Sequence, residues 1–159
     1  MNSVRLQPGE IKRLAVAAEA AAAPLQAAWL RATDAISAVV SAPQLRALEI
    51  VRQYKTINLS QLADELGCAP SSATRLCDRL VAAGLINRKA SAETRREISL
   101  SLRPQGTRLL HRLENRRRAE LAAALEKMTP TGARALIRGL EEYAQVSEHL
   151  THDKDQRLA

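Results

Sequence analysis

The sequence predicts a mainly α-helical fold with one small β-hairpin. The chain has 159 residues, the size of one domain that buries its own core. Its apolar content comes from Ala, Leu, Val and Ile, with no Phe and one Trp, and Ala and Leu favour helices. Apolar residues recur at three- and four-residue steps in most of the chain but alternate over 86–90 and 98–102, which is the pattern of strands.

The first long segment, 10–42, is expected to be an amphipathic helix. Pro24 should kink it or divide it in two, because proline lacks an amide hydrogen and clashes with the preceding turn. Its alanine-rich stripe leaves two interpretations open. The stripe packs against the core of the same chain, or it forms a small-residue seam between helices of two subunits.

Three shorter helices are expected next, over 41–54, 60–67 and 70–84. Ser41 is expected to cap the first of them, and Gly67 is expected to end the second. On each helix the apolar side chains fall on one face: Leu45, Leu48 and Val51, then Leu62, Ala63 and Leu66, then Ala73, Cys77 and Leu80.

The strands that follow are joined by the polar link SAETRR and are therefore expected to pair as a β-hairpin. A long helix over 105–127 and a last helix over 131–150 complete the chain, separated by Thr129-Pro130-Thr131. The remaining residues, 151–159, form a polar tail that is expected to fray.

Positive charge is concentrated in one part of the chain. The formal net charge is +7, yet 67–118 alone contains twelve Lys and Arg against four Asp and Glu. A local excess of this kind favours a polyanionic partner, and double-stranded DNA is the expected one.

The order helix, helix, turn, helix, hairpin predicts a winged helix-turn-helix, in which the third helix enters the major groove. Short hydroxyl side chains let a helix approach the bases, and Arg can bond guanine through two hydrogen bonds. Arg75 is the expected base reader and Arg79 the expected phosphate contact. The alternative is that both pair with Asp78, Glu65 or solvent. The residues predicted to face DNA from the second and third helices are Ser60, Gln61, Ser71, Ser72, Thr74, Arg75 and Arg79.

The hairpin supplies the other predicted contacts. Arg95 and Arg96 lie at its tip, a shape suited to the narrow minor groove, where arginine is favoured. Arg88, Lys89 and Arg103 are expected to contact phosphates around the site.

The stretch "LADELGCAPSSATRLCDRLVAAGLINRKASAETRREISLSLRPQG" resembles the MarR family of bacterial transcriptional regulators. The resemblance lies in the "LA-x-x-LG", "TR-x-x-D-R-L-x-x-x-GL-I-x-R" and "L-x-P-x-G" elements and the paired arginines, and it covers about 41–110. It implies a homodimer with a DNA-binding domain at 41–104 and a dimerisation region formed by 1–40 and 105–150. It also implies that Arg96 enters the minor groove.

Two positions depart from the family pattern. Thr94 stands where an acidic residue usually orients the wing arginine, and Ala69 stands where Ser or Thr usually caps the recognition helix. Loss of that cap costs about 1 kcal/mol. The geometry of the wing and the affinity for DNA are therefore the open points of the resemblance.

Family members often release DNA when a small, frequently aromatic and anionic molecule binds between their two parts. By that resemblance Trp29, Arg46 and Arg112 are expected to border an effector pocket. The alternative is that Trp29 packs at the subunit seam.

The chain offers no recognisable catalytic constellation, so no enzyme, cofactor or metal site is expected. His149 and His152 lack a complete ligand set. Cys68 and Cys77 form no disulfide framework and suit a reducing cytoplasm. Cys77 is expected to be a small core residue, Cys68 a partly buried turn residue, and neither a redox sensor. No segment is apolar for long enough to span a membrane.

The predicted function is a homodimeric, sequence-specific transcriptional regulator, a repressor released by a small-molecule ligand. The alternative is a winged-helix protein-interaction module without sequence-specific DNA binding.

Overall fold

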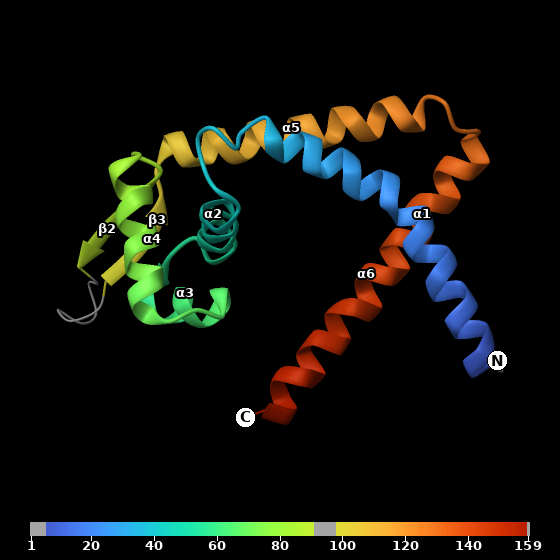
Figure 1. The fold of residues 1–159 in the computed structure, drawn as a ribbon, viewed down its shortest axis with the longest axis horizontal. Coiled ribbons are helices and arrows are strands. Elements are labelled where there is room, and N and C mark those ends of the chain that lie inside the picture. The colour runs from blue at the N-terminus through green and yellow to red at the C-terminus, as the bar shows by residue number, and fades with distance from the viewer. Residues whose placement is uncertain (1–5, 91–97, 159) are drawn as a thin grey trace. The chain divides into compact units, whose positions relative to one another are not determined.

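The computed structural model describes residues 6–90 and 98–158, and Figure 1 shows the arrangement of its elements. The elements follow in the order α1 (Pro8–Asp34), α2 (Ala42–Tyr54), β1 (Ile57–Asn58), α3 (Leu59–Leu66), α4 (Pro70–Ala82), β2 (Ile86–Ala90), β3 (Ile98–Leu102), α5 (Pro104–Leu125) and α6 (Pro130–Leu158). The chain divides into two compact units, Met1–Glu120 and Leu121–Ala159. The predicted helical fold with a β-hairpin is confirmed.

The first helix is one continuous element. It continues through Pro24 and ends at Asp34. Of the two effects expected of Pro24, a kink or a division, the division is therefore wrong, and so is the predicted end at 42. The chain then turns, and the amide of Ile36 donates to the carbonyl of Thr33 at 2.9 Å. The turn buries Ile36 and Val40, which explains why the apolar pattern continues past the end of the helix.

At the starts of α2 and α3, the side chain three residues after the N-cap residue accepts a hydrogen bond from the N-cap amide. Gln44 Oε1 accepts a hydrogen bond from the Ser41 amide at 2.8 Å. In α3 the cap is Asn58, because Asn58 Oδ1 accepts from the Gln61 amide at 2.8 Å and Gln61 Oε1 accepts from the Asn58 amide at 3.2 Å. Such reciprocal bonds satisfy amides that have no partner inside the helix.

The sheet has one strand more than the sequence predicts. The predicted hairpin of β2 and β3 forms, and β1 pairs with the other side of β3, giving the antiparallel order β1-β3-β2. Leu100 at the centre of β3 lies opposite Ile57 on β1 and Arg88 on β2. Two residues are too few for an alternating pattern, so β1 could not be recognised from periodicity.

One apolar core joins the short helices to the sheet. Gly84 and Gly67 both end helical segments with positive φ, as their sequence positions suggest. The largest fully buried side chains are Leu48, Val51, Ile50, Ile57, Leu62, Leu80, Leu85, Ile86, Leu100, Leu109, Leu110 and Leu113.

Gly106 explains the glycine of the "L-x-P-x-G" element. It is buried in the first turn of α5, and a Cβ at this position would lie 2.3 Å from the carbonyl oxygen of Leu85. The same carbonyl accepts a hydrogen bond from the Arg103 amide at 2.9 Å. The start of α5 therefore packs directly on the backbone that leads into β2, and a side chain would push the two apart.

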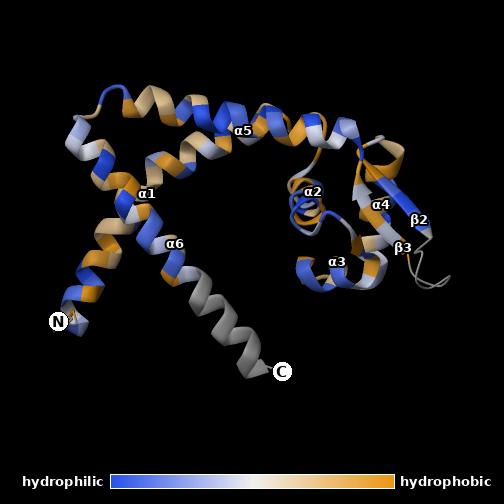
Figure 2. Ribbon diagram, turned by 180° about the vertical axis from the view of Figure 1, so that it is seen from behind, coloured by the Kyte–Doolittle hydropathy of each residue, from blue (hydrophilic) through white to orange (hydrophobic). Residues whose placement is uncertain are grey.

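The last helix extends further than predicted. It continues to Leu158, so the expected end at 150 is wrong. Figure 2 shows apolar residues distributed along both α1 and α6. The large apolar side chains exposed on these two helices are Ile11, Leu14, Val16, Trp29, Leu30, Leu136, Ile137, Leu140, Tyr143 and Val146. Over the described residues, no helix is sufficiently long and apolar to cross a membrane.

Candidate nucleic-acid interface

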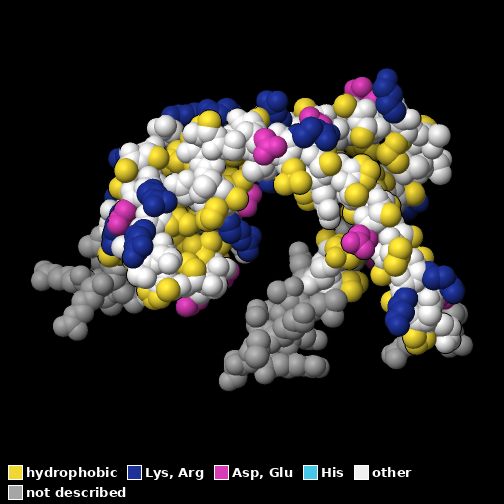
Figure 3. Space-filling model, in the orientation of Figure 1, with side chains coloured by type: hydrophobic (Ala, Val, Ile, Leu, Met, Phe, Trp, Pro, Cys, Tyr) yellow, Lys and Arg dark blue, Asp and Glu magenta, His cyan; other side chains and the backbone are white. Residues whose placement is uncertain are grey.

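The two faces of α4 differ sharply in burial. Ala73, Cys77 and Leu80 are fully buried against the core, as predicted from their spacing. The opposite face is exposed and carries Ser71, Ser72, Arg75, Asp78 and Arg79. Figure 3 shows Lys and Arg side chains, in dark blue, on the surface of this part of the molecule. The helix thus presents hydroxyl groups and positive charge while its other side is fixed by packing.

The N-terminus of α4 lacks a side-chain cap, as the alanine at position 69 implies. Pro70 begins the helix and has no amide hydrogen, so it removes one of the donors that a cap would have to satisfy. Thr74 Oγ1 donates to the Pro70 carbonyl at 2.9 Å. Its hydroxyl proton is therefore used within the helix, and the oxygen of Thr74 can act toward a partner only as an acceptor.

Asp78 and Glu65, the alternative partners expected for Arg75 and Arg79, are engaged elsewhere. Asp78 Oδ1 pairs with Arg88 Nη1 at 2.7 Å, from α4 to β2. The carboxylate of Glu65 accepts a hydrogen bond from the hydroxyl of Tyr54, and this bond raises the pKa of the tyrosine. Within the part of the chain that the structure describes, neither Arg75 nor Arg79 forms an ion pair.

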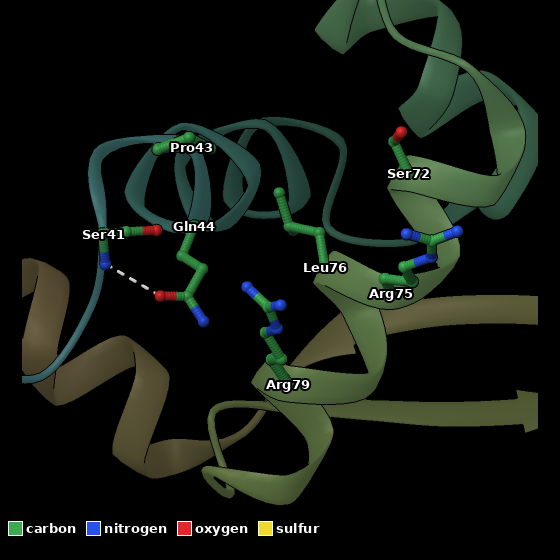
Figure 4. A pocket seen from close by; sticks show the side chains of 7 residues that line it. All are labelled: Ser41, Pro43, Gln44, Ser72, Arg75, Leu76 and Arg79. Carbon is green, nitrogen blue, oxygen red and sulfur yellow. Dashed lines mark hydrogen bonds between the residues drawn. The ribbon is translucent and has the colours of Figure 1, made fainter.

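A cavity of about 240 Å³ opens between the start of α2 and the exposed side of α4. Figure 4 shows its lining, with α2 residues on one side and the two arginines on the other. The contribution of α2 is not predicted from the sequence, because nothing in the local pattern of 41–44 indicates which helix it will face. The lining residues are Ser41, Pro43, Gln44, Ser72, Arg75, Leu76 and Arg79.

The wing residues differ in whether their side chains are already bonded to a neighbour. Arg88 is held by Asp78, and Arg103 Nε donates to Asn87 Oδ1 at 2.9 Å. Lys89 on β2 is exposed. The predicted wing-tip contacts Arg95 and Arg96, and Thr94 beside them, lie outside the described residues.

The predicted contacts on α3 lie in its first turn, where Ser60 and Gln61 are both exposed. The capping hydrogen bonds use the amide and the side-chain oxygen of Gln61. Its side-chain NH₂ group takes no part in these two bonds and can only donate.

The two cysteines occupy the places the sequence predicts. Cys77 is buried in the core, and burial raises the pKa of its thiol to about 11. Cys68 is half-buried in the turn after α3. A thiol with a raised pKa holds little thiolate at neutral pH, and the thiolate is the reactive form.

Ion pairs connect α5 with α2 and α1. Arg52 of α2 pairs with Glu114 of α5, and the hydrogen bond from Arg52 is the main reason that the pKa of Glu114 is lowered. Arg31 of α1 pairs with Glu120 at 3.0 Å.

The arginine beside Trp29 is Arg117, which is not among the residues predicted for the effector pocket. Its guanidinium lies 5.9 Å from the centre of the indole ring, and Nη1 is 3.5 Å from Glu49 Oε1. Arg117 follows Leu110 and Leu113 at helical spacing and so lies on the same face of α5. This spacing is the feature of the sequence that could have indicated its position. The predicted pocket residues Arg46 and Arg112 are exposed.

The order of the helices and the antiparallel sheet define the class of fold as a winged helix-turn-helix. Residues 40–98 match the model of the MarR family. The chain is also 27% identical over 110 residues, 69% of each protein, to the uncharacterized HTH-type transcriptional regulator YfiV of Bacillus subtilis. These similarities indicate a DNA-binding transcriptional regulator in which residues 40–98 resemble the MarR family.

Solved structures share the fold of this chain. The RV1404 protein of Mycobacterium tuberculosis is 29% identical with a TM-score of 0.76, over 91% of this chain and 97% of that one. FabT of Streptococcus pneumoniae, solved in complex with DNA, is 26% identical with a TM-score of 0.54, over 70% of this chain and 78% of FabT. A MarR family protein of Bacillus stearothermophilus, 21% identical over 91% and 99% of the two chains, shares the fold with a TM-score of 0.74.

Proposed function

We propose that this protein is a homodimeric, sequence-specific repressor that binds a pseudo-palindromic duplex in the cytoplasm and is released by a small-molecule ligand. One observation carries the proposal: Arg75 lies on the exposed face of α4 without an ion-pair partner in the described part of the chain. A free guanidinium on a helix that can enter the major groove is the usual reader of guanine. The structure of FabT in complex with DNA supports the DNA-binding part of the proposal.

The remaining predicted contacts have different proposed roles. Ser71 and Ser72 let α4 approach the bases, while Ser60, Gln61 and Lys89 contact phosphates. Arg88 and Arg103 position the wing strands through their bonds to Asp78 and Asn87 and offer their remaining N–H groups to the backbone. We retain Arg96 as the minor-groove contact, with Arg95 beside it.

We propose that 41–104 is the DNA-binding domain, that 1–40 and 105–150 form the dimerisation region, and that 151–159 is a polar tail. The exposed apolar side chains of α1 and α6 support this division, because patches of that kind on a helix mark interaction surfaces. Two copies related by a two-fold axis would place their recognition helices about 34–36 Å apart, one turn of DNA.

The proposed effector is an aromatic anion bound near Trp29, with Arg46 and Arg112 at the border. Arg117 supports the proposal, because its guanidinium lies 5.9 Å from the centre of the Trp29 ring and adds a positive charge beside the indole. An aromatic carboxylate could pair with this charge and place its ring against the exposed indole.

Binding to defined duplexes separates the regulator from the alternative, a protein-interaction module. A duplex selected from a random pool and a random-sequence duplex are compared at several salt concentrations. A regulator prefers the selected duplex by about 10³-fold or more and binds more weakly as salt rises. A module that recognises an acidic protein does not discriminate between the two duplexes.

Arg75→Ala tests the base-reading role. We expect it to weaken the selected duplex by about 1–3 kcal/mol and to relax the preference at one base pair. Lys89→Ala is the control, because loss of a phosphate contact should weaken all sequences alike and reduce the salt slope by about 1. Equal losses of selected and random duplexes in Arg75→Ala would show that Arg75 does not read a base.

A further inference from the structure

The cavity between α2 and α4 is lined by cationic and neutral side chains. None of its seven lining residues is acidic, and two of them are arginines. Its volume of about 240 Å³ is several times the roughly 30 Å³ that one water molecule occupies in the liquid. The cavity is therefore large enough for a small anion with its remaining hydration.

Arg79 extends across the cavity and does not follow the direction of Arg75. In Figure 4 its guanidinium lies between Gln44 and Leu76, whereas that of Arg75 lies at the outer side of α4. Its charge thus faces the beginning of α2, where the lining contains no carboxylate. An unpaired guanidinium beside neutral donors favours the binding of an anion.

The orientation of the Gln44 amide follows from its hydrogen bond. Because Oε1 accepts from the Ser41 amide at 2.8 Å, the opposite end of the group is the NH₂, which can only donate. Figure 4 shows this nitrogen on the side of Arg79. The capping hydrogen bond of α2 therefore orients the NH₂ donor of Gln44 toward the cavity, next to the guanidinium of Arg79.

We propose that this cavity binds a backbone phosphate of DNA between Arg79 and Gln44, with the hydroxyl of Ser41 as a further donor. A phosphate offers several strong acceptor oxygens to such a set. DNA is the proposed source because Ser72 and Arg75, which face the bases in the proposed complex, line the same opening. The inference rests on the proposed function and adds α2 to the elements that hold the duplex.

Gln44→Glu is the decisive variant. The new carboxylate keeps the oxygen that accepts from the Ser41 amide, and Ser followed three residues later by Glu is a favoured start of a helix. The melting temperature should therefore be unchanged or higher. The NH₂ donor is replaced by a negative oxygen that repels phosphate, so affinity for the selected duplex should fall tenfold or more at low salt.

The matched control is Gln53→Glu, the same change at an exposed position near the other end of α2. Nine residues of helix separate the two positions by about 13 Å, and the change in net charge is identical. We expect Gln53→Glu to lose no more than about twofold, which measures the long-range effect of the charge. Equal losses in the two variants would overturn the proposal.

Arg79→Gln should weaken binding to selected and random duplexes alike and reduce the salt slope by about 0.9, the value for one phosphate. Combined with Gln44→Glu, it should cost much less than the product of the two single losses, because both remove the same contact. A duplex in which the contacted phosphate is replaced by an uncharged methylphosphonate should bind wild type more weakly than the unmodified duplex does. Gln44→Glu should bind the two duplexes equally well. Independent, multiplying losses would contradict a shared phosphate.

A titration with inorganic phosphate distinguishes the source of the anion. If Gln44→Glu abolishes binding of inorganic phosphate but leaves the duplex affinity at the level of Gln53→Glu, the site takes a free anion and the assignment to DNA is wrong. If wild type prefers no duplex at all, the proposed function fails, and the assignment to a DNA phosphate fails with it. The phosphate titration then shows whether the cavity still binds anions.

Discussion

The winged helix-turn-helix and the last helix differ in how far their apolar side chains are buried. In the first region Leu48, Leu62 and Leu80 are fully buried, because three short helices and a sheet pack on one another. In α6, Leu140 is 42% exposed and Tyr143 is 74% exposed. A compact arrangement of short elements closes its own core, whereas an apolar stripe on one long helix needs a second surface to cover it.

The largest expected effect is a loss of stability in the core of the winged helix-turn-helix. Leu48→Ala should reduce the free energy of unfolding by about 2–5 kcal/mol, because the substitution leaves a cavity among fully buried neighbours. Urea unfolding measures the loss. A decrease of less than about 1 kcal/mol would show that the core around α2 is loosely packed.

Leu140→Ala is the matched change on α6. If a second copy covers this helix, the variant should raise the dissociation constant of the dimer about tenfold in sedimentation experiments. Its effect on the unfolding of the dissociated chain should stay within about 0.5 kcal/mol. An unchanged dissociation constant would remove α6 from the proposed interface.

A smaller loss of stability is expected from a substitution in the first turn of α5. Gly106→Ala should destabilise the fold by about 1–3 kcal/mol, because its Cβ would lie 2.3 Å from the carbonyl oxygen of Leu85. The melting temperature and urea midpoint measure the change. Gln105→Ala, at the exposed neighbouring position, is the control and should have little effect.

The smallest expected effect concerns the ion pair of Arg52 and Glu114. Its hydrogen bond lowers the pKa of Glu114 below the ordinary value of 4.5. The pair therefore stabilises the fold above that value, and this contribution is lost as the pH falls through the lowered pKa. For a partly exposed pair such as this one it amounts to about 0.2–1 kcal/mol.

Urea midpoints at pH 7, 5, 4 and 3 check this dependence. Arg52→Gln should unfold at a lower urea concentration at pH 7 and should differ less from wild type at pH 3. A difference that stays constant over this range would exclude Glu114 as the cause.

Much of the winged domain could be predicted because its patterns are local. The spacing of Ala73, Cys77 and Leu80 is enough to predict the buried face of α4, and all three are fully buried. The strand β1 and the cap at Asn58 could not be predicted in this way. A two-residue strand has no period, and the periodic pattern of 60–67 did not reach back to Asn58.

The site was predicted less completely than the fold. Sequence spacing placed Arg75 and Arg79 on one exposed face of α4, but it could not show that Arg79 turns toward α2. Nor could it show that Asp78 is taken by Arg88 on β2. Both depend on residues from other elements, whose distance along the chain carries no information about their distance in space.

By itself the sequence determined the helices, the hairpin, the resemblance to the MarR family and the exposed face of α4, because each follows from local periodicity, punctuation or a contiguous motif. Only the tertiary structure decided which arginine lies beside Trp29, why Gly106 must be glycine, and that Ser41 and Gln44 share a cavity with α4. These are contacts between elements distant in the chain, and packing of the whole core sets their geometry.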